Sequence, residues 1–453
     1  MPQIDVQARW QALQEGLAEG NERSVQQALA ELYPQELLEH WDELSQEHRY
    51  TVLTLLPPQE AAEVFSHLEE DEQTELLKAL PPWRVKELLG ELPLDDLTDA
   101  LQAVEEENPQ QAEALLDQLD PQTRAEVEEL SEYEEDEAGG LMTPEYIALR
   151  DSMTVDEVFR FLRRAAPDAE QVYYLYVVDA ADRLEGVVSL RDLIVADPKT
   201  RIREIMNPDV VRVRTDTDQE EVARLMADYN FTVLPVVDEE GRLVGIVTID
   251  DVVDVIQEEA TEDIYRLGAV DSPELVYSKS DVWQLWSARV RWLVILVVGA
   301  MFSSTILEGF ETTLQAVTAL TFYITILLGA GGNTGNQSST IIVRALATGD
   351  VRGRDWWRIF LKELSVGALL GTTLAALLSI KVLIDGHGEI LPVVAASLAT
   401  LMTVANILGA LLPIGIKKIG LDPALISNPL IATLSDIAGL TIYLSMARWL
   451  LGL

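Results

Sequence analysis

The chain has 453 residues, more than a single hydrophobic core usually holds, and its formal net charge is −43. Residues 1–280 contain 66 of the 76 Asp and Glu but only 22 of the 33 Lys and Arg, and this negative surplus disfavours nucleic acids and anionic lipids as partners. The chain has no cysteine and only four histidines, which excludes disulfides and thiolate metal sites and leaves hard cations such as Mg²⁺, Ca²⁺ and Mn²⁺.

The first 136 residues show the pattern of short amphipathic helices. Leu, Val and Ala recur every three or four residues, and proline interrupts the pattern at residues 57–58, 81–82, 93 and 121. Proline fits the first turn of a helix and disrupts its interior, so these positions predict helix starts. Residues 1–136 are therefore expected to form an acidic N-terminal domain, a superhelix of helical hairpins.

A second kind of repeat occupies residues 137–256. Leu141-Met142-Thr143-Pro144 returns as Ile205-Met206-Asn207-Pro208, and the glycine turn, apolar strand and helix beginning at Gly186 return 59 residues later at Gly245. Each copy has the order of helix, strand, turn, strand and helix. The copies resemble a tandem pair of cystathionine-β-synthase-type (CBS) domains, at residues 137–200 and 201–256, and such pairs often bind adenine nucleotides.

An acidic helical stretch, residues 257–285, leads to five apolar stretches at 292–307, 314–343, 364–380, 390–416 and 423–447, interrupted only by Asp436. About 20 apolar residues span a bilayer, so residues 286–453 are predicted to form a transmembrane domain. Basic residues such as Arg289, Arg344 and Lys417 flank alternate ends of these spans. The positive-inside tendency then predicts a multi-pass plasma (inner) membrane protein with cytoplasmic N-terminal domains and an outside C-terminus.

The predicted fold is thus multi-domain. It combines an all-α acidic helical superhelix, an α/β tandem CBS pair, a long connecting (plug) helix and a five-helix α transmembrane domain.

Asp436 is the sharpest single signal in the apolar region. It lies ~18 Å along a helix that begins near Ala424, close to the middle of a bilayer. A carboxylate at that depth costs a few kcal/mol, so it is expected to face a wet cavity or a cation path. The structural alternative is a protonated or paired Asp.

The segment from Gly329 to Ser338 is unusual for a membrane span. It has four glycines in seven residues and is rich in Asn, Thr, Gln and Ser, which weakens a lipid-facing helix. It predicts either a pore lining or close helix packing through small residues. Because Mg²⁺ keeps several waters, one carboxylate with amide and carbonyl oxygens suffices for it, and one Asp436 per chain favours a two-fold pore between subunits.

The whole arrangement resembles the MgtE-type magnesium channel family. The most specific matches are the segments Gly331 to Ser338 and Asn428 to Asp436. The resemblance implies a homodimer in the lipid bilayer with Mg²⁺ in a pore on the two-fold axis. It assigns pore metal binding to Asp436, Ala432, Gly329, Gly332, Asn336 and Asn428.

The acidic residues of the connector predict a cation sensor. Asp250, Asp251, Asp254, Glu258, Glu259, Glu262 and Asp263 follow helical spacing and repel one another without a counter-ion, although any single acidic residue is most simply a solvated surface group. A divalent cation would bridge them. The family resemblance implies a cytosolic Mg²⁺ sensor made of Glu63, Asp95, Asp218, Glu220, Asp251, Asp254, Glu259, Glu262, Asp263 and Asp422. Asn230 stands where the family is expected to have another sensor carboxylate.

The CBS pair also offers a nucleotide site. By resemblance, ATP would contact Tyr174, Arg191, Asp192, Phe231, Leu234 and Pro235, with Arg191 near phosphate and Asp192 near the ribose hydroxyls.

The predicted function is a Mg²⁺-selective channel that imports magnesium, closes when Mg²⁺ bridges the acidic domains, and is modulated by ATP. Mn²⁺, Co²⁺ and Ca²⁺ also accept oxygen ligands and are candidate ions at some sites. The alternatives are a proton- or sodium-coupled divalent-cation carrier and a membrane-anchored nucleotide sensor. No P-loop, nucleophile motif or transition-metal spacing is evident, so no enzyme is predicted.

Overall fold

A computed structural model describes residues 6–165, 171–270, 277, 280–419, 422 and 427–453. The chain divides into two compact units, Met1–Val255 and Ile256–Leu453. Both have the elements that the sequence predicts: helices and a CBS pair in the first, and long apolar helices in the second.

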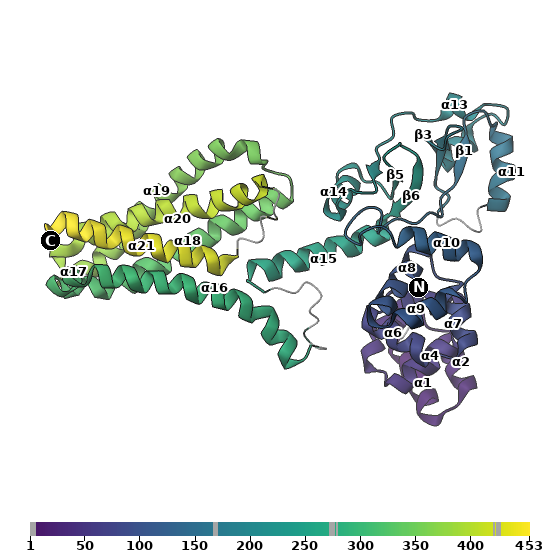
Figure 1. The fold of residues 1–453 in the computed structure, drawn as a ribbon, viewed down its shortest axis with the longest axis horizontal. Coiled ribbons are helices and arrows are strands. Elements are labelled where there is room, and N and C mark those ends of the chain that lie inside the picture. The colour runs from purple at the N-terminus through teal and green to yellow at the C-terminus, as the bar shows by residue number, and fades with distance from the viewer. Residues whose placement is uncertain (1–5, 166–170, 271–276, 278–279, 420–421, 423–426) are drawn as a thin grey trace. The chain divides into compact units, whose positions relative to one another are not determined.

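The N-terminal part is helical throughout, and its helices follow one another in a winding stack (Figure 1). Proline occupies the first turn of α3, α5, α7, α9 and α10, and Pro93 caps α8, as expected from a residue with fixed φ and no N–H. The elements are α1 (Val6–Glu19), α2 (Glu22–Leu29), α3 (Pro34–Glu39), a 3-10 turn (Trp41–Glu43), α4 (Gln46–Leu55), α5 (Pro58–Ser66), α6 (Glu70–Ala79), α7 (Pro82–Leu89), α8 (Leu94–Glu107), α9 (Pro109–Leu116) and α10 (Pro121–Leu130).

Arg84 of α7 ties successive helices together in this stack. Its guanidinium, 2% exposed as a residue, donates to the backbone oxygens of Leu53 (2.8 Å) and Leu56 (2.6 Å) and pairs with Glu87 (3.1 Å). These bonds satisfy carbonyls at the end of α4 that have no partner within that helix. The buried guanidinium of Arg84 thus stabilises the packing of α7 against α4, in a domain where most charged groups are acidic and solvated.

Each CBS repeat builds one three-stranded sheet, with a parallel and an antiparallel pairing. The first sheet has the order β1-β2-β3 and the second β4-β5-β6. The elements of the first repeat are β1 (Ala148–Arg150), α11 (Val155–Ala165), β2 (Tyr174–Val178), β3 (Leu184–Ser189), α12 (Leu190–Val195) and α13 (Ile202–Ile205). Those of the second are β4 (Val213–Arg214), α14 (Gln219–Tyr229), β5 (Val233–Val237), β6 (Leu243–Thr248) and α15 (Ile249–Leu267).

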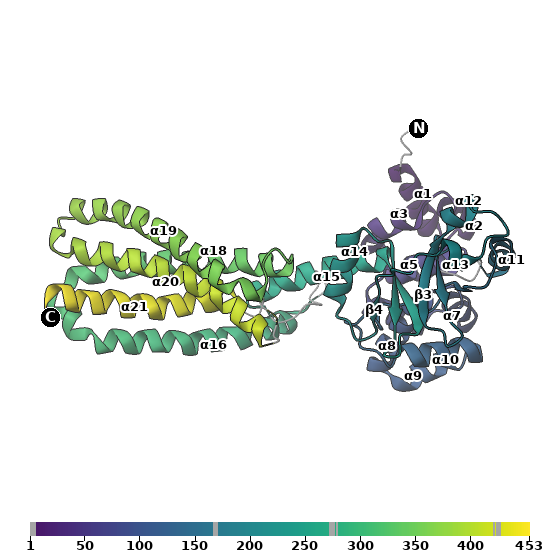
Figure 2. The same ribbon diagram turned by 90° about the horizontal axis from the view of Figure 1, so that it is seen from above.

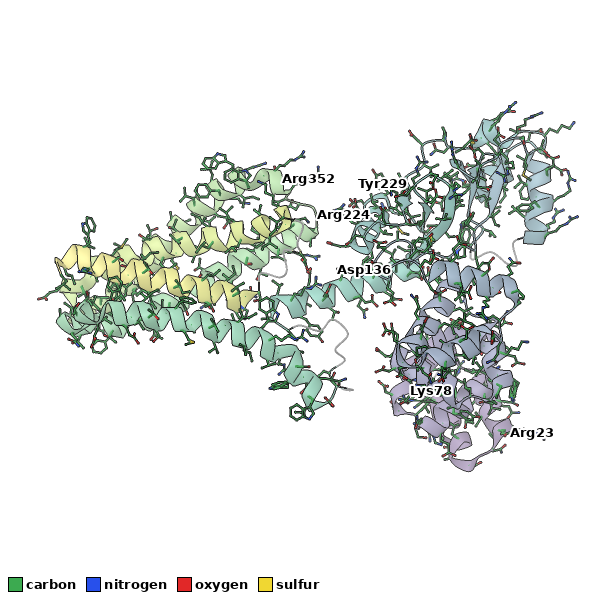
Figure 3. The ribbon with its side chains drawn as sticks, viewed as in Figure 1. Arg23, Lys78, Asp136, Arg224, Tyr229 and Arg352 are labelled. Carbon is green, nitrogen blue, oxygen red and sulfur yellow. The ribbon has the colours of Figure 1, made fainter. Side chains whose placement is uncertain are left out.

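The repeated motifs interlock the two CBS copies. Met142 of the first motif lies against Gly245 of the second repeat, and Met206 of the second lies against Gly186 of the first. A Cβ at either glycine would stand within 3 Å of the methionine sulfur, so a larger residue there would force the methionine to move. The N-terminal helices join the second copy through Gln219 N–H donating to Asp136 O (2.9 Å), and Asp136 is labelled in Figure 3.

The second unit contains the long apolar helices, which lie alongside one another in both views (Figures 1 and 2). They are α16 (Val282–Gly309), α18 (Thr321–Ala347), α19 (Trp356–Ile384), α20 (Leu391–Lys418) and α21 (Asn428–Leu451). The short elements are α17 (Glu311–Ala316) and 3-10 turns at Thr318–Leu320, Gly353–Asp355 and Gly388–Ile390. The predicted connector is divided, because α15 ends at Leu267 and α16 begins at Val282.

Within the described ranges, four helical segments are long and apolar enough to cross a membrane: Val282–Gly309, Gly353–Ile384, Gly388–Lys418 and Asn428–Leu451. The second predicted span is the exception. Its first residues form α17 and a 3-10 turn, so the helix begins at Thr321 rather than Leu314. Helix α18 has 27 residues, ~40 Å of length, but its Gly and Asn content lowers its hydropathy. The start of the fifth predicted span, residues 423–426, lies outside the described residues.

Candidate functional site

A hollow of about 360 Å³ lies between α18 and α21. From α18, Gly329, Gly332 and Asn336 reach it, and from α21, Ala432 and Asp436. Ile324, Thr325, Leu328 and Asn333 complete the lining. Five of the six residues predicted for the pore therefore surround one space. The sixth, Asn428, lies apart from this lining, and its side-chain oxygen accepts a bond from Thr340 Oγ1 (3.5 Å).

The glycines on two faces of α18 have different surroundings. Gly331 lies against Leu401 of α20, and Gly335 lies against Ile431 and Ser435 of α21, while Gly409 of α20 contacts the Gly335 backbone. Gly329 has no neighbour within 4 Å of a Cβ position, and Gly332 meets only Ala432 at 3.5 Å. The glycine-rich segment thus packs closely on one face, as one of the two predictions expects, and leaves open space beside Gly329 on the other.

Two polar groups of the hollow have no partner among the described residues. Asp436 is only partly buried and makes no hydrogen bond or ion pair with any described residue. Asn336 Oδ1 is buried and likewise has no partner among the described residues. Buried carboxylate and amide oxygens normally have donors, so these two acceptors fit a ligand that brings hydrogens of its own, such as a hydrated cation.

Glu363 is a membrane carboxylate that the sequence reading missed. It lies on α19 and accepts from Asn406 Nδ2 (2.6 Å) and Ser338 Oγ (3.2 Å), so it joins α18, α19 and α20. Ser338 also donates to Asn406 O (2.9 Å). The sequence analysis did not select Glu363 because it lies one residue before the predicted apolar stretch that begins at Leu364. An acidic residue directly beside an apolar stretch is a signal that could have identified it. Glu363 is satisfied within the helix bundle, whereas Asp436 is not.

In the first unit, α8 brings carboxylates close to the start of α15. Asp251 accepts from Thr248 Oγ1 (2.5 Å), and burial raises its pKa to about 6, with Asp250 and Asp254 adding repulsion. Asp99 is exposed to solvent at the surface of α8, although much of the space around it is filled by protein. That desolvation, followed by repulsion from Asp96 and Glu135, raises the pKa of Asp99 to about 7. The sequence reading named Asp95 and Asp251 and missed Asp99, one turn beyond Asp95.

A second acidic group lies at the end of α15 in the second unit. Burial raises the pKa of Glu262 and of Asp263, and Glu259 and Asp422 add repulsion to both. Arg266 forms ion pairs with Glu262 and with Asp422. The structure therefore brings four predicted sensor residues together with an arginine.

The remaining predicted sensor residues are dispersed in the structure. Glu63 of α5 accepts from Gln35 Nε2 (2.7 Å), and Asp254 is exposed on α15. Asp218 caps α14 and accepts from the Glu220 backbone N–H (2.9 Å). Asn230 ends α14 at φ 54°, a left-handed conformation that Asn tolerates better than most residues, so it has a structural role as well. Among the described residues, no three His, Asp or Glu side chains form a ready metal cage.

The residues predicted for nucleotide binding lie on both CBS copies. Tyr174 begins β2 and is 40% exposed, and Arg191 on α12 makes no ion pair among described residues. Asp192 accepts from Ser189 Oγ (2.6 Å). On the second copy, the ring of Phe231 stacks on that of the exposed Tyr229 with 5.3 Å between the ring centroids, Leu234 is buried, and Pro235 pairs with Ile246 in the sheet. Tyr229 is labelled in Figure 3.

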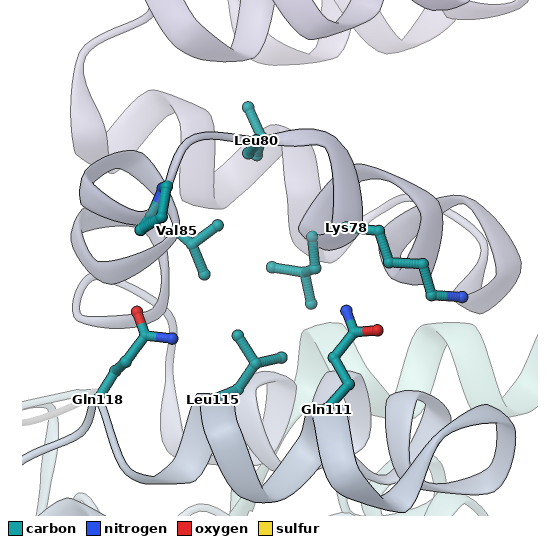
Figure 4. Close-up of a pocket in the computed structure, with 8 residues that line it drawn as sticks. Lys78, Leu80, Val85, Gln111, Leu115 and Gln118 are labelled. Atoms are coloured by element: carbon teal, nitrogen blue, oxygen red, sulfur yellow. The ribbon is translucent and has the colours of Figure 1, made fainter.

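One further hollow, of about 350 Å³, lies between α6, α7 and α9 (Figure 4). Leu80, Val85 and Leu115 line it with Lys78, Gln111 and Gln118. Lys78 pairs with Glu107. None of the predicted sites includes a residue of this lining.

Family comparisons define the class of the protein. The descriptions that match are an MgtE intracellular N domain at residues 32–136, CBS domains at residues 138–199 and 202–258, and an MgtE divalent cation transporter domain at residues 324–446. Together they place the chain among the membrane transporters of divalent cations, which are not enzymes.

Relatives that match over most of the chain identify its family within this class. The magnesium transporter MgtE of Thermus thermophilus is 66% identical over 440 residues, which are 97% of this chain and 98% of that protein. MgtE of Enterococcus faecalis is 37% identical over 323 residues, 71% of each chain. The chain belongs to the MgtE family, as its motifs had indicated.

Solved structures match the soluble part. One, the cytosolic domain of the Mg²⁺ channel MgtE in complex with ATP, is 71% identical and covers 54% of this chain and 98% of its own, with a TM-score of 0.53. Another, the soluble part of a magnesium transporter, is 34% identical and covers 56% of this chain and 100% of its own, with a TM-score of 0.51. They support the multi-domain fold.

The raised pKa of Asp99 predicts a pH-dependent stability. An ordinary Asp has a pKa of 3.8, so the folded state holds this proton more tightly, and stability falls as pH rises toward about 7. In chelator, the melting temperature of the wild-type chain should fall between pH 5 and pH 8 by more than that of Asp99→Asn. Glu106→Gln, an exposed carboxylate on the same helix, is the control. Equal pH slopes for wild type and Asp99→Asn would contradict this account.

The two glycine faces predict opposite results for the same substitution. A methyl group at Gly335 would stand 2.7 Å from Ile431 Cγ2 and 3.0 Å from Ser435 Oγ, whereas one at Gly329 meets nothing within 4 Å. Overpacking costs about 1–3 kcal/mol, and the gain in helix propensity is the same at both sites. Gly335→Ala should therefore melt lower than Gly329→Ala in detergent. Equal melting temperatures would show that α18 and α21 separate easily.

Proposed function

We propose that the chain is a Mg²⁺ channel: a homodimer in the lipid bilayer that admits magnesium to the cytosol and closes when Mg²⁺ bridges its acidic domains. Asp436 supports this most directly. Its carboxylate lies on a helix that is long and apolar enough to cross a membrane, faces a hollow, and has no partner among the described residues. The names of its relatives, magnesium transporters, point to the same ion.

The hollow is large enough for an ion that keeps its water. Mg²⁺ prefers six ligands and gives up water reluctantly, and six waters at about 30 Å³ each occupy roughly 180 Å³. The hollow has about 360 Å³. Waters of the coat would donate to Asp436 and Asn336 Oδ1, and the backbone oxygens of Gly329, Gly332 and Ala432 offer further acceptors. Asn428 would act at the start of α21, apart from this space.

Charge favours a divalent ion. A carboxylate and a divalent ion separated by one water layer, about 4.5 Å, attract by roughly 7 kcal/mol at an effective dielectric constant of 20, and a monovalent ion gains half of that. Two Asp436 carboxylates across a two-fold axis would neutralise one Mg²⁺. Selection against Mn²⁺, Co²⁺ and Ca²⁺ would depend on the water coat, because all four ions carry the same charge.

A second copy also solves a solvation problem. Gly329, Asn333 and Thr325 are exposed in the single chain, and so is much of α16, including Val297 and Met301. If the hollow faced hydrocarbon, its amide and carboxylate would lose water without compensation. A homodimer with the two hollows facing each other would enclose an aqueous path instead.

Gating would use the acidic groups of α8, α14 and α15. Raised pKa values at Asp99, Asp251, Glu262 and Asp263 record carboxylates that are desolvated and crowded by like charge. Mg²⁺ would relieve this repulsion in the closed state and would bind only weakly to the open state. This difference in affinity is what would shift the equilibrium between the open and closed states. The proposed sensor residues are Glu63, Asp95, Asp218, Glu220, Asp251, Asp254, Glu259, Glu262, Asp263 and Asp422.

ATP is proposed as a modulator of this gate. The free guanidinium of Arg191 suits a phosphate, and the exposed ring of Tyr174 suits an adenine. A solved relative of the cytosolic part was obtained with ATP. Asp192, Phe231, Leu234 and Pro235 would complete the site. A membrane-anchored nucleotide sensor without transport is the weaker alternative, because it does not explain why a carboxylate, Asp436, faces a hollow on an apolar helix.

Removal of the membrane carboxylate tests the transport proposal. In liposomes, Asp436→Asn should lower Mg²⁺ flux at least about tenfold, because the hydrated ion loses its charge partner while the side-chain volume stays the same. Glu308→Gln, an exposed carboxylate at the end of α16, should transport normally. Wild-type flux through Asp436→Asn would reject the pore. Flux strictly coupled to pH or Na⁺, without single-channel currents, would identify a carrier instead.

Removal of the acidic half tests the gate. A chain lacking residues 1 to about 270 should conduct in membrane patches at cytosolic Mg²⁺ concentrations that close the wild type, since the bridging carboxylates of the superhelix, CBS pair and α15 are gone. Single-channel open probability against Mg²⁺ is the measurement. Unchanged Mg²⁺ closure in the shortened chain would place the sensor in the membrane helices.

A further inference from the structure

Arg266 in the last turn of α15 joins two carboxylates that are far apart in sequence. Its guanidinium pairs with Glu262, one turn earlier on the same helix, and with Asp422, which precedes α21. The side chains are partly withdrawn from solvent: 34% of Arg266, 19% of Glu262 and 32% of Asp422 is exposed. The planar fork of arginine can serve two carboxylates at once, which a lysine does less well.

Several negative charges surround Arg266. Among the described residues, Glu259 and Asp422 repel Glu262 and Asp263, whereas Arg266 attracts both carboxylates and Arg344 attracts Asp263. Burial and this mutual repulsion raise the pKa of Glu262 and of Asp263, while Arg266 opposes the rise in both. Arg266 thus already does part of what a bound cation would do, which is to hold α15 and Asp422 together.

Arg266 and a divalent cation cannot share these carboxylates. A Mg²⁺ ion bound between these carboxylates would lie beside the guanidinium and would be repelled by its positive charge. To bind between Glu262 and Asp422, the ion must therefore displace Arg266 toward solvent. Because Arg266 is fixed to the same helix as Glu262, its competition is intramolecular, and it weakens as salt screens the charges.

We propose that Arg266 is a tethered competitor for the divalent-cation site at Glu262, Asp263 and Asp422, and that it sets the Mg²⁺ concentration at which this part of the sensor fills. The inference rests on the proposed Mg²⁺ gate and adds to it the residue that determines its affinity. Without Arg266 the carboxylates would repel each other more at low Mg²⁺ and bind Mg²⁺ more tightly. The arginine keeps the site empty until cytosolic Mg²⁺ is high.

The sign of the effect separates competition from assistance. If Arg266 competes, its removal lowers the Mg²⁺ midpoint, by about three- to tenfold for two partly exposed ion pairs. If Arg266 instead assists closure by bridging, its removal raises the midpoint. If Arg266 has no influence on Mg²⁺ binding, its removal leaves the Mg²⁺ midpoint unchanged.

The experiment uses the full-length chain in lipid nanodiscs. Hydrogen exchange of the α15 backbone amides is followed against Mg²⁺ for wild type, Arg266→Gln, Arg266→Lys and Arg160→Gln, and patch recordings give the closure midpoint of each. Arg160 forms an exposed pair with Asp156 four residues away on α11, so Arg160→Gln is a matched control for loss of an i,i+4 pair. Exchange of α18 to α21 reports whether each variant is folded.

We expect the protection and closure midpoints of Arg266→Gln to fall about three- to tenfold, those of Arg266→Lys to lie between Arg266→Gln and wild type because lysine serves two carboxylates less well, and those of Arg160→Gln to be unchanged. An unchanged or higher midpoint for Arg266→Gln overturns the competitor, while the wild-type response leaves the Mg²⁺ gate intact. A wild type without any Mg²⁺ response overturns the gate, and the competitor with it.

Discussion

The membrane part of this protein depends on how closely helix α18 approaches α20 and α21. Gly331, Gly335 and Gly409 remove the side chains that would hold these helices apart, and each would meet a neighbour within about 3 Å if it carried a Cβ. This contact fixes the rotation of α18, so that Gly329, Gly332 and Asn336 turn to the hollow beside Asp436. The same backbone contact therefore decides both how the bundle packs and which polar groups are left for an ion.

Negative charge is handled differently along the chain. In the superhelix, Arg84 and Arg124 gather nearby carbonyls or carboxylates into structural contacts, and most other carboxylates stay solvated. At the two ends of α15, carboxylates are instead crowded and desolvated, which raises their pKa values. Such crowding costs stability unless a cation relieves it, so these regions are the natural places for stability to depend on Mg²⁺.

The sequence alone predicted the order of the domains well, because proline starts, the 59-residue repeat and the apolar stretches are local signals. Five of the six residues that it predicted for a pore meet in one hollow, since the spacing in the segments around Gly332 and Asp436 carries that information. It could not show that α18 begins at Thr321, or that Met142 and Met206 cross to the other repeat. Nor could it reveal Asp99, Glu363 or Arg266, because their roles arise from partners brought together only by folding, such as Asn406 for Glu363 and Asp422 for Arg266.

Glu363 and Asp436 show why hydrogen-bond accounting is a better guide to function than the presence of a charge. Both are carboxylates on long apolar helices, and hydropathy treats them alike. Glu363 has an amide and a hydroxyl donor from two other helices, so its desolvation is compensated and it can act as a structural tie. Asp436 has no such donor among the described residues, and it lies beside a hollow that is open to other groups. A hydrated cation would supply both the charge and the hydrogen bonds that Asp436 lacks, and for this reason the proposed pore is placed at Asp436 rather than at Glu363.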